Sequence, residues 1–465
     1  MKWENCQRVP LYSSCLREIV LTNWVIFFDS STVQNPFVQL LLNSVFLDRE
    51  LANLSHVSKS WRKTILDSGA PRRRLNRLDD PQLEQHSIRL LTNDSTPFDS
   101  LRVLCHTNYL STNGVVYGWG STLRGQLPGI ARFNDQSVPT KLDTFGIISH
   151  TAAGTGLSFA IKQAKLVGCG WNYFNQLGAA TNNYQLVWDL SPGAMPALRT
   201  VDNSSISTFA IDIKGHLWSW GSTAYGLLGR ASNGYTDGTP QRIDYLLDYK
   251  IKQVASGHYQ TVCLTIHGEV FTWGHQNYAG QGSLAHHLSM PLELDIEKIC
   301  QIACGYSHTL LLSADQKTIW SFGSNSYRQL GRPHNFFAAL TPVKVPFSCA
   351  GIITKIACCD FDSAVLSSDG KITVFGSTWN GGLFAAMRTI RLDSVVDISI
   401  GSGFMLALTS DNCLYAFGNN DEGQCGQGYI SDEIPEPVRV KNLPPSRIMQ
   451  LSAGHNHCLI KCALF

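Results

Sequence analysis

The first residues that could carry chemistry in this sequence are four histidines placed near glycines: His258, His308, His455 and His457. A histidine titrates near neutral pH, so it can serve as a general acid, a general base or a metal ligand. His308 and His457 each follow the glycine of a recurring phrase by three residues. The other copies of that phrase carry, at the same slot, Leu157, Ile206, Gln260, Asp362 and Phe404. Because such different residues fill one slot, we interpret it as structural and expect no catalysis there.

Other motifs that would indicate an enzyme are missing from the sequence. The GxG pairs at 118/120, 168/170 and 401/403 lack the third glycine of a dinucleotide loop. Neither a GxxxxGK[ST] phosphate loop nor a GxSxG nucleophile elbow occurs. The fourteen cysteines contain no CxxC pair, and most lie in apolar runs such as QIACGYSH. We therefore predict a protein that is not an enzyme, with no cofactor and no metal site, in a reducing compartment.

Composition narrows the class of partner. The formal net charge is +2, and the densest basic tract is PRRRLNR at 71–77. Phosphate binding needs concentrated lysine and arginine, so nucleic acid is not favoured as a partner. The apolar run VIFF at 25–28 is too short to span a bilayer, and the first residues show no signal-peptide pattern. The sequence thus predicts a protein of the cytosol, the nucleus or both, without a membrane partner.

Two phrases recur along the chain and keep step with each other. Aromatic-glycine phrases such as WSWG, FTWG and WSFG end at glycines 120, 170, 221, 274, 323, 376 and 418. A second phrase, small residues followed by an apolar run, precedes each of the last six glycines and also follows the last one, as in IACGYSHTLLL at 302 and LSAGHNHCLI at 451. A period of about 50 residues is typical of a propeller or solenoid repeat.

The local pattern within each unit is that of β-strands. Apolar runs joined by short turns, as in AVLSSDGKITVFG, predict antiparallel strands with Asp and Gly at the turns. One small sheet cannot bury both of its faces, so the units must pack against each other, and a closed ring of units leaves few free edges. The sequence therefore predicts a mainly β protein built as a ring of small sheets.

The repeat resembles the regulator of chromosome condensation family. The resemblance rests on GYSHTLLL, IWSFGSNSYRQLG, GWNYFNQLG and GNNDEGQCG, and it covers residues 101–465. It implies a seven-bladed β-propeller, which we assign to residues 114–465. We expect the C-terminal strands to pair with residues 115–120 and so close the ring. The founding member of this family is a nucleotide-exchange factor for a small GTPase, which makes a GTPase-binding or exchange-factor propeller one alternative function.

Residues 36–66 resemble an F-box. The strongest part is VSKSWR at 57–62, preceded by LANLSHV, whereas Asn35-Pro36 stands where Leu-Pro is usual. The resemblance implies a small α-helical region that binds the adaptor of an SCF-type ubiquitin ligase. The adaptor-binding residues implied are Pro36, Leu40, Leu41, Leu51, Leu54, Val57 and Trp61. Residues 1–35 are then an N-terminal extension and 67–113 a linker. An ordinary helical cap on the propeller is the alternative for this segment, because an apolar helix face is usually core.

F-box and propeller together favour the substrate receptor of an SCF-type ubiquitin ligase as the main hypothesis. The F-box would bind the adaptor and, through it, the cullin scaffold, and the propeller would hold an unidentified target protein for ubiquitination and degradation. A receptor of this kind acts by proximity, without bond chemistry of its own. A non-catalytic interaction scaffold is the second alternative, after the GTPase-binding propeller.

One repeat slot offers candidates for the target-binding surface. Four consecutive units place an aromatic residue four positions after the aromatic-glycine: Phe174, Tyr225, Tyr278 and Tyr327. The other units carry Arg124, Asn380 and Glu422 there, and Trp379 lies beside the slot in the shortest unit. Exposed aromatics are favoured as binding anchors, so we predict an arc of these residues with Trp379. Packing of the loop itself is the alternative role for an aromatic at this slot.

Overall fold

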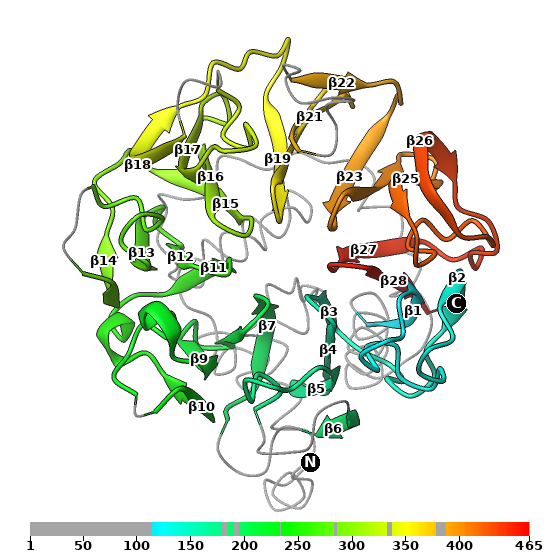
Figure 1. The fold of residues 1–465 in the computed structure, drawn as a ribbon, viewed down its shortest axis with the longest axis horizontal. Helices are drawn as coiled ribbons and strands as arrows, with labels where there is room; N and C mark the ends of the chain where they lie inside the picture. Colours follow the sequence, from blue (N-terminus) through cyan, green and yellow to red (C-terminus); the bar gives the residue numbers. More distant parts are fainter. Residues whose placement is uncertain are drawn as a thin grey trace, which may run out of the picture. The chain divides into compact units, whose positions relative to one another are not determined.

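The computed structural model describes residues 113–178, 185–189, 195–232, 234–282, 286–332, 337–377 and 387–464 of the 465 in the chain. The F-box-like region, its adaptor-binding residues and most of the linker lie outside these residues, and so does Trp379. The described residues belong to one compact unit. They form seven antiparallel sheets of four strands each, arranged around a ring (Figure 1). The seven-bladed propeller predicted from the repeat is thereby confirmed.

Each sheet is one blade, with its first strand at the centre of the ring and its fourth at the rim. The innermost strands are β3 (His150–Ala153), β7 (Leu198–Asn203), β11 (Ile251–Ser256), β15 (Ile299–Cys304), β19 (Ile353–Cys359), β23 (Val395–Ile400) and β27 (Ile448–Ala453). The second strands are β4 (Leu157–Lys162), β8 (Ser207–Asp212), β12 (Gln260–Thr265), β16 (His308–Ser313), β20 (Asp362–Ser367), β24 (Phe404–Thr409) and β28 (His457–Ala463).

The two outer positions complete each blade. The third strands are β5 (Lys165–Gly170), β9 (Leu217–Ser222), β13 (Val270–Gly274), β17 (Ile319–Ser324), β21 (Ile372–Gly376), β25 (Leu414–Asn420) and β1 (Gly114–Gly120). The rim strands are β6 (Gln185–Asp189), β10 (Thr236–Arg242), β14 (Leu288–Glu293), β18 (Ala338–Lys344), β22 (Arg388–Ile390), β26 (Ser431–Arg439) and β2 (Gln136–Lys141). Two short 3-10 turns, η4 (Ala224–Gly226) and η5 (Asp244–Leu246), lie in connections. Blades are numbered 1 to 7 from β3–β6 to the sheet of β27, β28, β1 and β2.

The seventh blade closes the ring because it joins both ends of the described chain. β1 pairs antiparallel with β28, from Gly114 opposite Ala463 to Gly120 opposite His457. The expected pairing of C-terminal strands with residues 115–120 is therefore present. Since the strand sequence β2-β1-β28-β27 is continuous, the seventh blade has the same hydrogen-bonded width as the other six.

The second strand of each blade explains the apolar runs of the repeat. The strands β8, β12, β16, β20 and β24 are buried along their whole length, because neighbouring blades cover both of their faces. A strand buried on both faces carries a near-continuous hydrophobic run instead of an alternating pattern. Each aromatic of an aromatic-glycine phrase then packs in the core between blades, and Trp119, Trp220 and Trp273 are fully buried there.

The glycine-rich loop of one blade is fixed against the aromatic of the next. The indole of Trp220 donates to the carbonyl of Gln176 at 2.8 Å, and Trp273 does the same to Leu227 at 2.6 Å. Gly229 lies flat against Trp273, where a Cβ would be 2.9 Å from the ring and φ is +66°. This close approach requires glycine, which accounts for the end of the recurring GQLG phrase.

The histidine slot of the repeat is structural, as its varied occupants indicated. The Nε2 of His308 lies 2.9 Å from the hydroxyl of Ser363 in the next blade, and that of His457 lies 2.8 Å from Ser158. Both rings are fully buried. One occupant assigned from the sequence is wrong: Ser207, not Ile206, pairs with Gly221 as the equivalent residue of blade 2. The serine begins β8, and the small-residue phrase there is too weak to fix the alignment to one residue.

Candidate functional site

One face of the propeller gathers two loops from every blade. The turn between first and second strands and the loop between third and fourth strands lie at the same end of each sheet, because the start of the second strand pairs with the end of the third, as Gln260 does with Gly274. We call this end the loop face. It is the face on which the residues four positions after the aromatic-glycine lie.

A single hydrogen-bonded design holds the loop between third and fourth strands. In blade 4, the Asn325 side chain accepts the Leu330 N–H at 3.1 Å, and the Gln329 side chain accepts the Tyr327 N–H at 2.9 Å. The same pair of contacts recurs in blade 1, on Leu177 and Phe174, and in blade 6, on Cys425 and Glu422. The residue whose N–H the glutamine accepts therefore has the same backbone contact in these blades, although it is Tyr327, Phe174 or Glu422.

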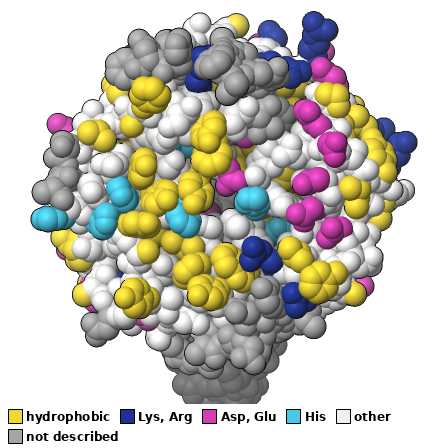
Figure 2. All heavy atoms as spheres, in the orientation of Figure 1, with side chains coloured by type: hydrophobic (Ala, Val, Ile, Leu, Met, Phe, Trp, Pro, Cys, Tyr) yellow, Lys and Arg dark blue, Asp and Glu magenta, His cyan; other side chains and the backbone are white. Residues whose placement is uncertain are grey.

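Three of the tyrosines predicted from this slot become members of one surface. Tyr327 is 49% exposed, whereas Tyr225 and Tyr278 are half-buried. They do not contact each other directly but are joined through other rings at centroid distances of 4.6–5.7 Å. We call this connected set the aromatic–histidine patch: Tyr225, His258, Tyr259, His275, Tyr278, His287, Tyr306, Tyr327 and Phe361. The patch crosses blades 2 to 5. Figure 2 shows histidine and hydrophobic side chains together over this part of the loop face.

The centre of the patch is Tyr259, which follows β11. Its ring lies 5.1 Å from Tyr225, 5.2 Å from Tyr278 and 5.4 Å from Tyr306, so it connects blades 2, 3 and 4. Aromatic pairs at such distances stabilise each other by about 0.5–1.5 kcal/mol beyond area burial. The patch is thus a preorganised surface rather than a set of independent side chains.

Two histidines of the patch, His258 and His275, have lowered pKa values that favour their neutral form. Burial lowers the pKa of His258, against an opposing effect of Asp360. Its ring stacks on Tyr306 at 4.6 Å, and its Nδ1 lies 2.7 Å from the Ser205 hydroxyl. Burial and the neighbouring His287 lower the pKa of His275, whose Nδ1 accepts the Asn277 N–H at 3.2 Å. Near neutral pH, His258 and His275 therefore add uncharged rings to the tyrosines and Phe361, and such rings can be covered at small desolvation cost.

Phe174 does not join the patch. It belongs to a separate cluster on blade 1, with Trp171 at 5.6 Å and Tyr173 at 5.0 Å between ring centroids. Tyr173 is 64% exposed, and the guanidinium of Arg124 lies 4.3 Å above the Trp171 ring. The loop face therefore carries two aromatic groups. The target-binding role predicted for Phe174, Tyr225, Tyr278 and Tyr327 stays a prediction.

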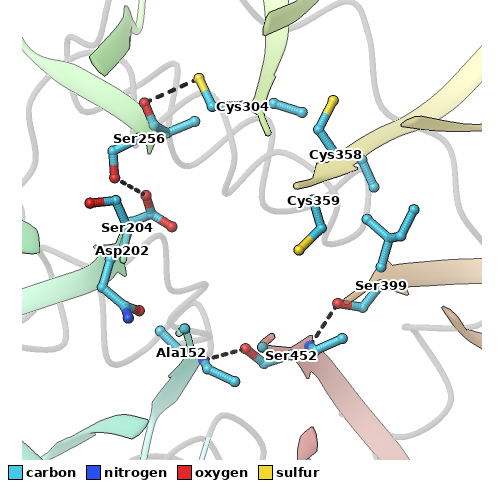
Figure 3. Close-up of a pocket in the computed structure, with 18 of the residues that line it drawn as sticks. Ala152, Asp202, Ser204, Ser256, Cys304, Cys358, Cys359, Ser399 and Ser452 are labelled. Atoms are coloured by element: carbon cyan, nitrogen blue, oxygen red, sulfur yellow. Dashed lines mark hydrogen bonds between the residues drawn. The ribbon is translucent and has the colours of Figure 1, made fainter. Parts of the chain in front are cut away.

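A channel of about 390 Å³ runs along the axis between the innermost strands. Figure 3 shows its wall, where Asp202 and Ser256 face Cys359, Ser399 and Ser452 across the opening, and Cys304 lies beside Ser256. The Ser256 hydroxyl donates to Asp202 at 3.3 Å, but burial raises the pKa of Asp202 to about 6. Burial also raises the pKa of the Cys359 thiol well above its usual value, so the thiol is a poor nucleophile.

Further tests of the expected chemistry concern only the described part of the chain. Within it, no group of three His, Cys, Asp or Glu side chains is placed to hold a metal ion. Nor does any helix in these same ranges have the length and apolarity needed to cross a membrane.

Sequence reasoning missed the residues that connect the patch. Tyr259 and Phe361 lie in the turn between first and second strands, directly before the histidine slot, and Tyr306 lies one residue earlier in the same turn. Their signal was present, since HYQ, YSH and DFD follow the repeat glycine or its equivalent in blades 3, 4 and 5. The periodicity could not reveal that this turn and the following loop meet on one face, because that requires the hydrogen-bond register.

Comparison with known proteins gives relatives with the same repeat. The chain is 27% identical over 379 residues to the E3 ubiquitin-protein ligase HERC2 of Homo sapiens. This alignment covers 75% of this chain but 8% of HERC2. It is 26% identical over 407 residues to the secretion-regulating guanine nucleotide exchange factor of Mus musculus, covering 78% of this chain and 87% of that protein. The chain thus spans less than a tenth of the HERC2 relatives and most of the exchange factor.

Solved structures show the same fold. Human WBSCR16 superposes with a TM-score of 0.68 at 23% identity over 76% of this chain and 99% of that one. Prp20p of Saccharomyces cerevisiae, whose binding to Gsp1p and histones was described with its structure, gives 0.66 at 18% identity over 77% and 94%. The profile of the RCC1-like domain matches residues 197–460, more than half of the sequence. The protein therefore belongs to the RCC1-like domain family, and its seven blades and closing strand pair agree with that assignment.

Proposed function

We propose that the propeller binds a small GTPase on its loop face and promotes nucleotide exchange. The observation that carries the proposal is the aromatic–histidine patch, a connected surface of aromatic and histidine rings across four blades. Tyrosines and other aromatics are the residues that most often anchor protein partners. The likeness to the mouse exchange factor extends over most of both chains, which favours a GTPase as the partner.

Exchange of this kind needs no catalytic group. A binder that prefers the nucleotide-free form of a GTPase weakens nucleotide binding by the same factor, because coupling between two binding sites is reciprocal. A rigid face is suited to this task, since it can favour one conformation of its partner over another. The hydrogen-bonded loops and ring contacts of the loop face supply such rigidity.

The test is the release of a fluorescent GDP analogue from a panel of purified small GTPases in the presence of the full chain. We expect one GTPase or subgroup to release nucleotide at least about tenfold faster, a coupling within the usual range for linked sites. Tyr278→Ala should abolish most of the effect. Tyr245→Ala is the matched control, because Tyr245 is 53% exposed in η5 at the opposite end of the blades. No acceleration with any GTPase would refute the exchange proposal.

A second candidate function rests on VSKSWR at 57–62 and on the resemblance of residues 36–66 to an F-box. In this reading the adaptor and cullin of an SCF-type ligase bind through Leu51, Leu54, Val57 and Trp61, and the propeller holds the target. The ubiquitin-ligase relative matches this chain over only 8% of its own length, so the likeness supports a shared propeller and gives no support for ligase activity. The compartment, cytosolic or nuclear, belongs to the same hypothesis, and a relative from Arabidopsis thaliana named as mitochondrial also matches.

The adaptor test is a pulldown with purified adaptor protein. Deletion of 36–64 should abolish capture while the propeller keeps its cooperative melting, and Trp61→Ala should weaken capture without affecting nucleotide release. Adaptor binding by the deletion variant would exclude the F-box. If neither GTPase nor adaptor binds, a non-catalytic interaction scaffold is the reading that remains.

A further inference from the structure

The loop face has an unequal charge distribution around the ring. Between Arg391 and Arg439 the sequence contains no Lys, Arg or His, although the whole chain has a net charge of +2. This stretch forms β23 to β26 of blade 6 and carries the carboxylates Asp393, Asp397, Asp411, Asp421, Glu422, Asp432, Glu433 and Glu436. Lysine and arginine from outside the stretch pair with two of them, Lys355 with Asp397 and Arg388 with Glu436. The stretch itself supplies no cation, which is a departure from the rest of the propeller.

Four of these carboxylates lie at the loop-face end of blade 6. Asp421 and Glu422 are in the loop after β25, and Asp432 and Glu433 lie near the start of β26, where Glu433 pairs with Asn419. All but Glu422 are exposed. We call these four residues the acidic rim. Figure 2 shows acidic side chains gathered over β25 and β26, across the face from the histidine and hydrophobic side chains over β11 to β14.

The repeat itself places the two chemistries opposite each other. Glu422 fills in blade 6 the slot that Tyr278 fills in blade 3. Its N–H is bound by Gln424 as that of Tyr327 is bound by Gln329, and its carboxylate accepts the Asn456 amide at 2.7 Å. The same repeat slot thus presents a ring on one side of the channel mouth and a carboxylate on the other.

From this arrangement we propose that the loop face binds a two-part partner segment, in which apolar side chains cover the aromatic–histidine patch and a basic stretch reaches the acidic rim. The inference deepens the proposed function, on which it rests for the use of this face, by naming the chemistry of the partner surface. The patch supplies affinity through the burial of its rings. The rim supplies orientation and the rate of encounter, because complementary exposed charges act mainly on association and specificity.

The occupant is identified by charge complementarity across one rigid face. An acidic partner would meet four carboxylates at the rim and be repelled, whereas an all-basic partner would leave the apolar patch uncovered. A segment that joins both chemistries satisfies both halves at once, and a linker that matches the span raises the effective concentration of the second contact.

The probe is a pair of synthetic peptides that differ only in charge. Both contain a Leu-Phe block and a Gly-Ser spacer made in several lengths, followed by four lysines in one peptide and four glutamates in the other. Affinity for the full-length chain is measured by fluorescence anisotropy at low and at high ionic strength. We expect the lysine peptide to bind about tenfold more tightly at low salt, with the preference shrinking as salt screens the exposed charges.

Variants assign the effect to the two halves. Glu433→Lys and Asp432→Lys, each alone, should reduce the preference for lysine about threefold, whereas Asp393→Lys, the same charge change on an exposed residue at the other end of blade 6, should leave it unchanged. Tyr278→Ala should weaken both peptides equally. Equal affinity for the two peptides, or a preference that survives both rim variants, would overturn the inference. Because no GTPase is present, the outcome is separate from that of the exchange assay.

Discussion

The hydroxyl of Ser363 accepts a hydrogen bond from the Nε2–H of His308. The two atoms lie 2.9 Å apart, and the same hydroxyl donates its one proton to the carbonyl of Gln329 at 2.8 Å. A hydroxyl has one proton, and because that of Ser363 is donated to Gln329, its oxygen can only accept a hydrogen bond from the histidine. His308 therefore carries its proton on Nε2, and the ring is neutral while it joins blade 4 to blade 5.

The first prediction is loss of stability in mild acid. Burial lowers the pKa of His308 and His457 to about 3 and, with Lys461 nearby, that of His150 to about 4. The unfolded chain binds these protons near pH 6.5, so it holds more protons than the folded ring between about pH 6.5 and 3. Unfolding becomes easier throughout that window. Melting temperature measured from pH 8 to pH 4 should fall steeply below about pH 6.5.

His308→Gln tests the assignment. Blade 3 already carries Gln260 in the same slot, where its side-chain amide donates to the Gly305 and His308 carbonyls. As pH falls from 7 to 5, the free energy of unfolding should decrease by about 1–2 kcal/mol less in the variant than in the natural chain, because the variant lacks one buried titrating group. His286→Gln is the control, since His286 is exposed. A pH profile of His308→Gln identical to that of the natural chain would show that this ring does not carry the acid sensitivity.

A second prediction concerns Asp202 and has the opposite sign. Its pKa is raised to about 6 by burial, so the folded state holds a proton that the unfolded state releases between about pH 4 and pH 6. Stability contributed by this group therefore falls as pH rises through that window. Asp202→Asn, which keeps an acceptor for Ser256, should stabilise the ring by about 1–2 kcal/mol at pH 7.5 and have little effect at pH 4. Equal effects at both pH values would contradict this account of the channel.

A third prediction separates two costs of replacing a glycine. Gly229 and Gly234 both have φ in the left-handed region, at +66° and +80°. A Cβ at Gly229 would lie 2.9 Å from the Trp273 ring, whereas one at Gly234 meets nothing within 4 Å. Gly234→Ala should cost about 1 kcal/mol of unfolding free energy, the conformational part alone. Gly229→Ala should cost about 1–3 kcal/mol more, because the ring contact between blades 2 and 3 must shift. Urea unfolding of both variants measures the difference, and equal costs would remove the steric argument.

A fourth prediction concerns ring closure. Removal of 451–465 deletes β28 and the second half of β27, so β1 loses its partner and exposes an unpaired edge. Such an edge promotes pairing between molecules, so we expect aggregation or loss of cooperative unfolding. A chain lacking only 464 and 465, beyond β28, is the control. A monomeric, cooperatively melting 1–450 fragment, seen by light scattering and calorimetry, would show that the closing pair is dispensable.

The repeat allowed much of the architecture to be predicted, because its two phrases are the contacts between blades. For one blade to pack on the next, Trp220 and Trp273 must be buried and Gly229 must lack a side chain. The regular spacing of such residues in the sequence therefore indicates a ring of packed blades. The slot of Tyr225, Tyr278 and Tyr327 was visible for the same reason. Function leaves no periodic trace of this kind, since it lies where the repeat varies.

What the sequence could not show is how loops from different blades meet. Tyr259 and Tyr225 are in different phrases, and only the pairing of strands brings their rings to 5.1 Å. Phe174 occupies the slot of Tyr327 and is held by the same hydrogen bonds, yet it packs with Trp171 in a separate cluster, because its neighbours in the adjoining blades differ. The repeat slot fixes the direction of a side chain, but the rings that this side chain contacts come from residues that are distant in sequence.

The shared seventh blade also sets the order of events in time. Blades 1 to 6 are each built from consecutive strands, so their sheets can form from local hairpins. The seventh needs contacts such as that of the Trp119 indole with the Gln424 carbonyl, 305 residues away, and long-range closure is the slow step of folding. The same step in reverse is the opening of β1 from β28. The lifetime of the folded ring is therefore governed by the seven residue pairs between β1 and β28. A partner that contacts blades 6, 7 and 1 together would lengthen this lifetime.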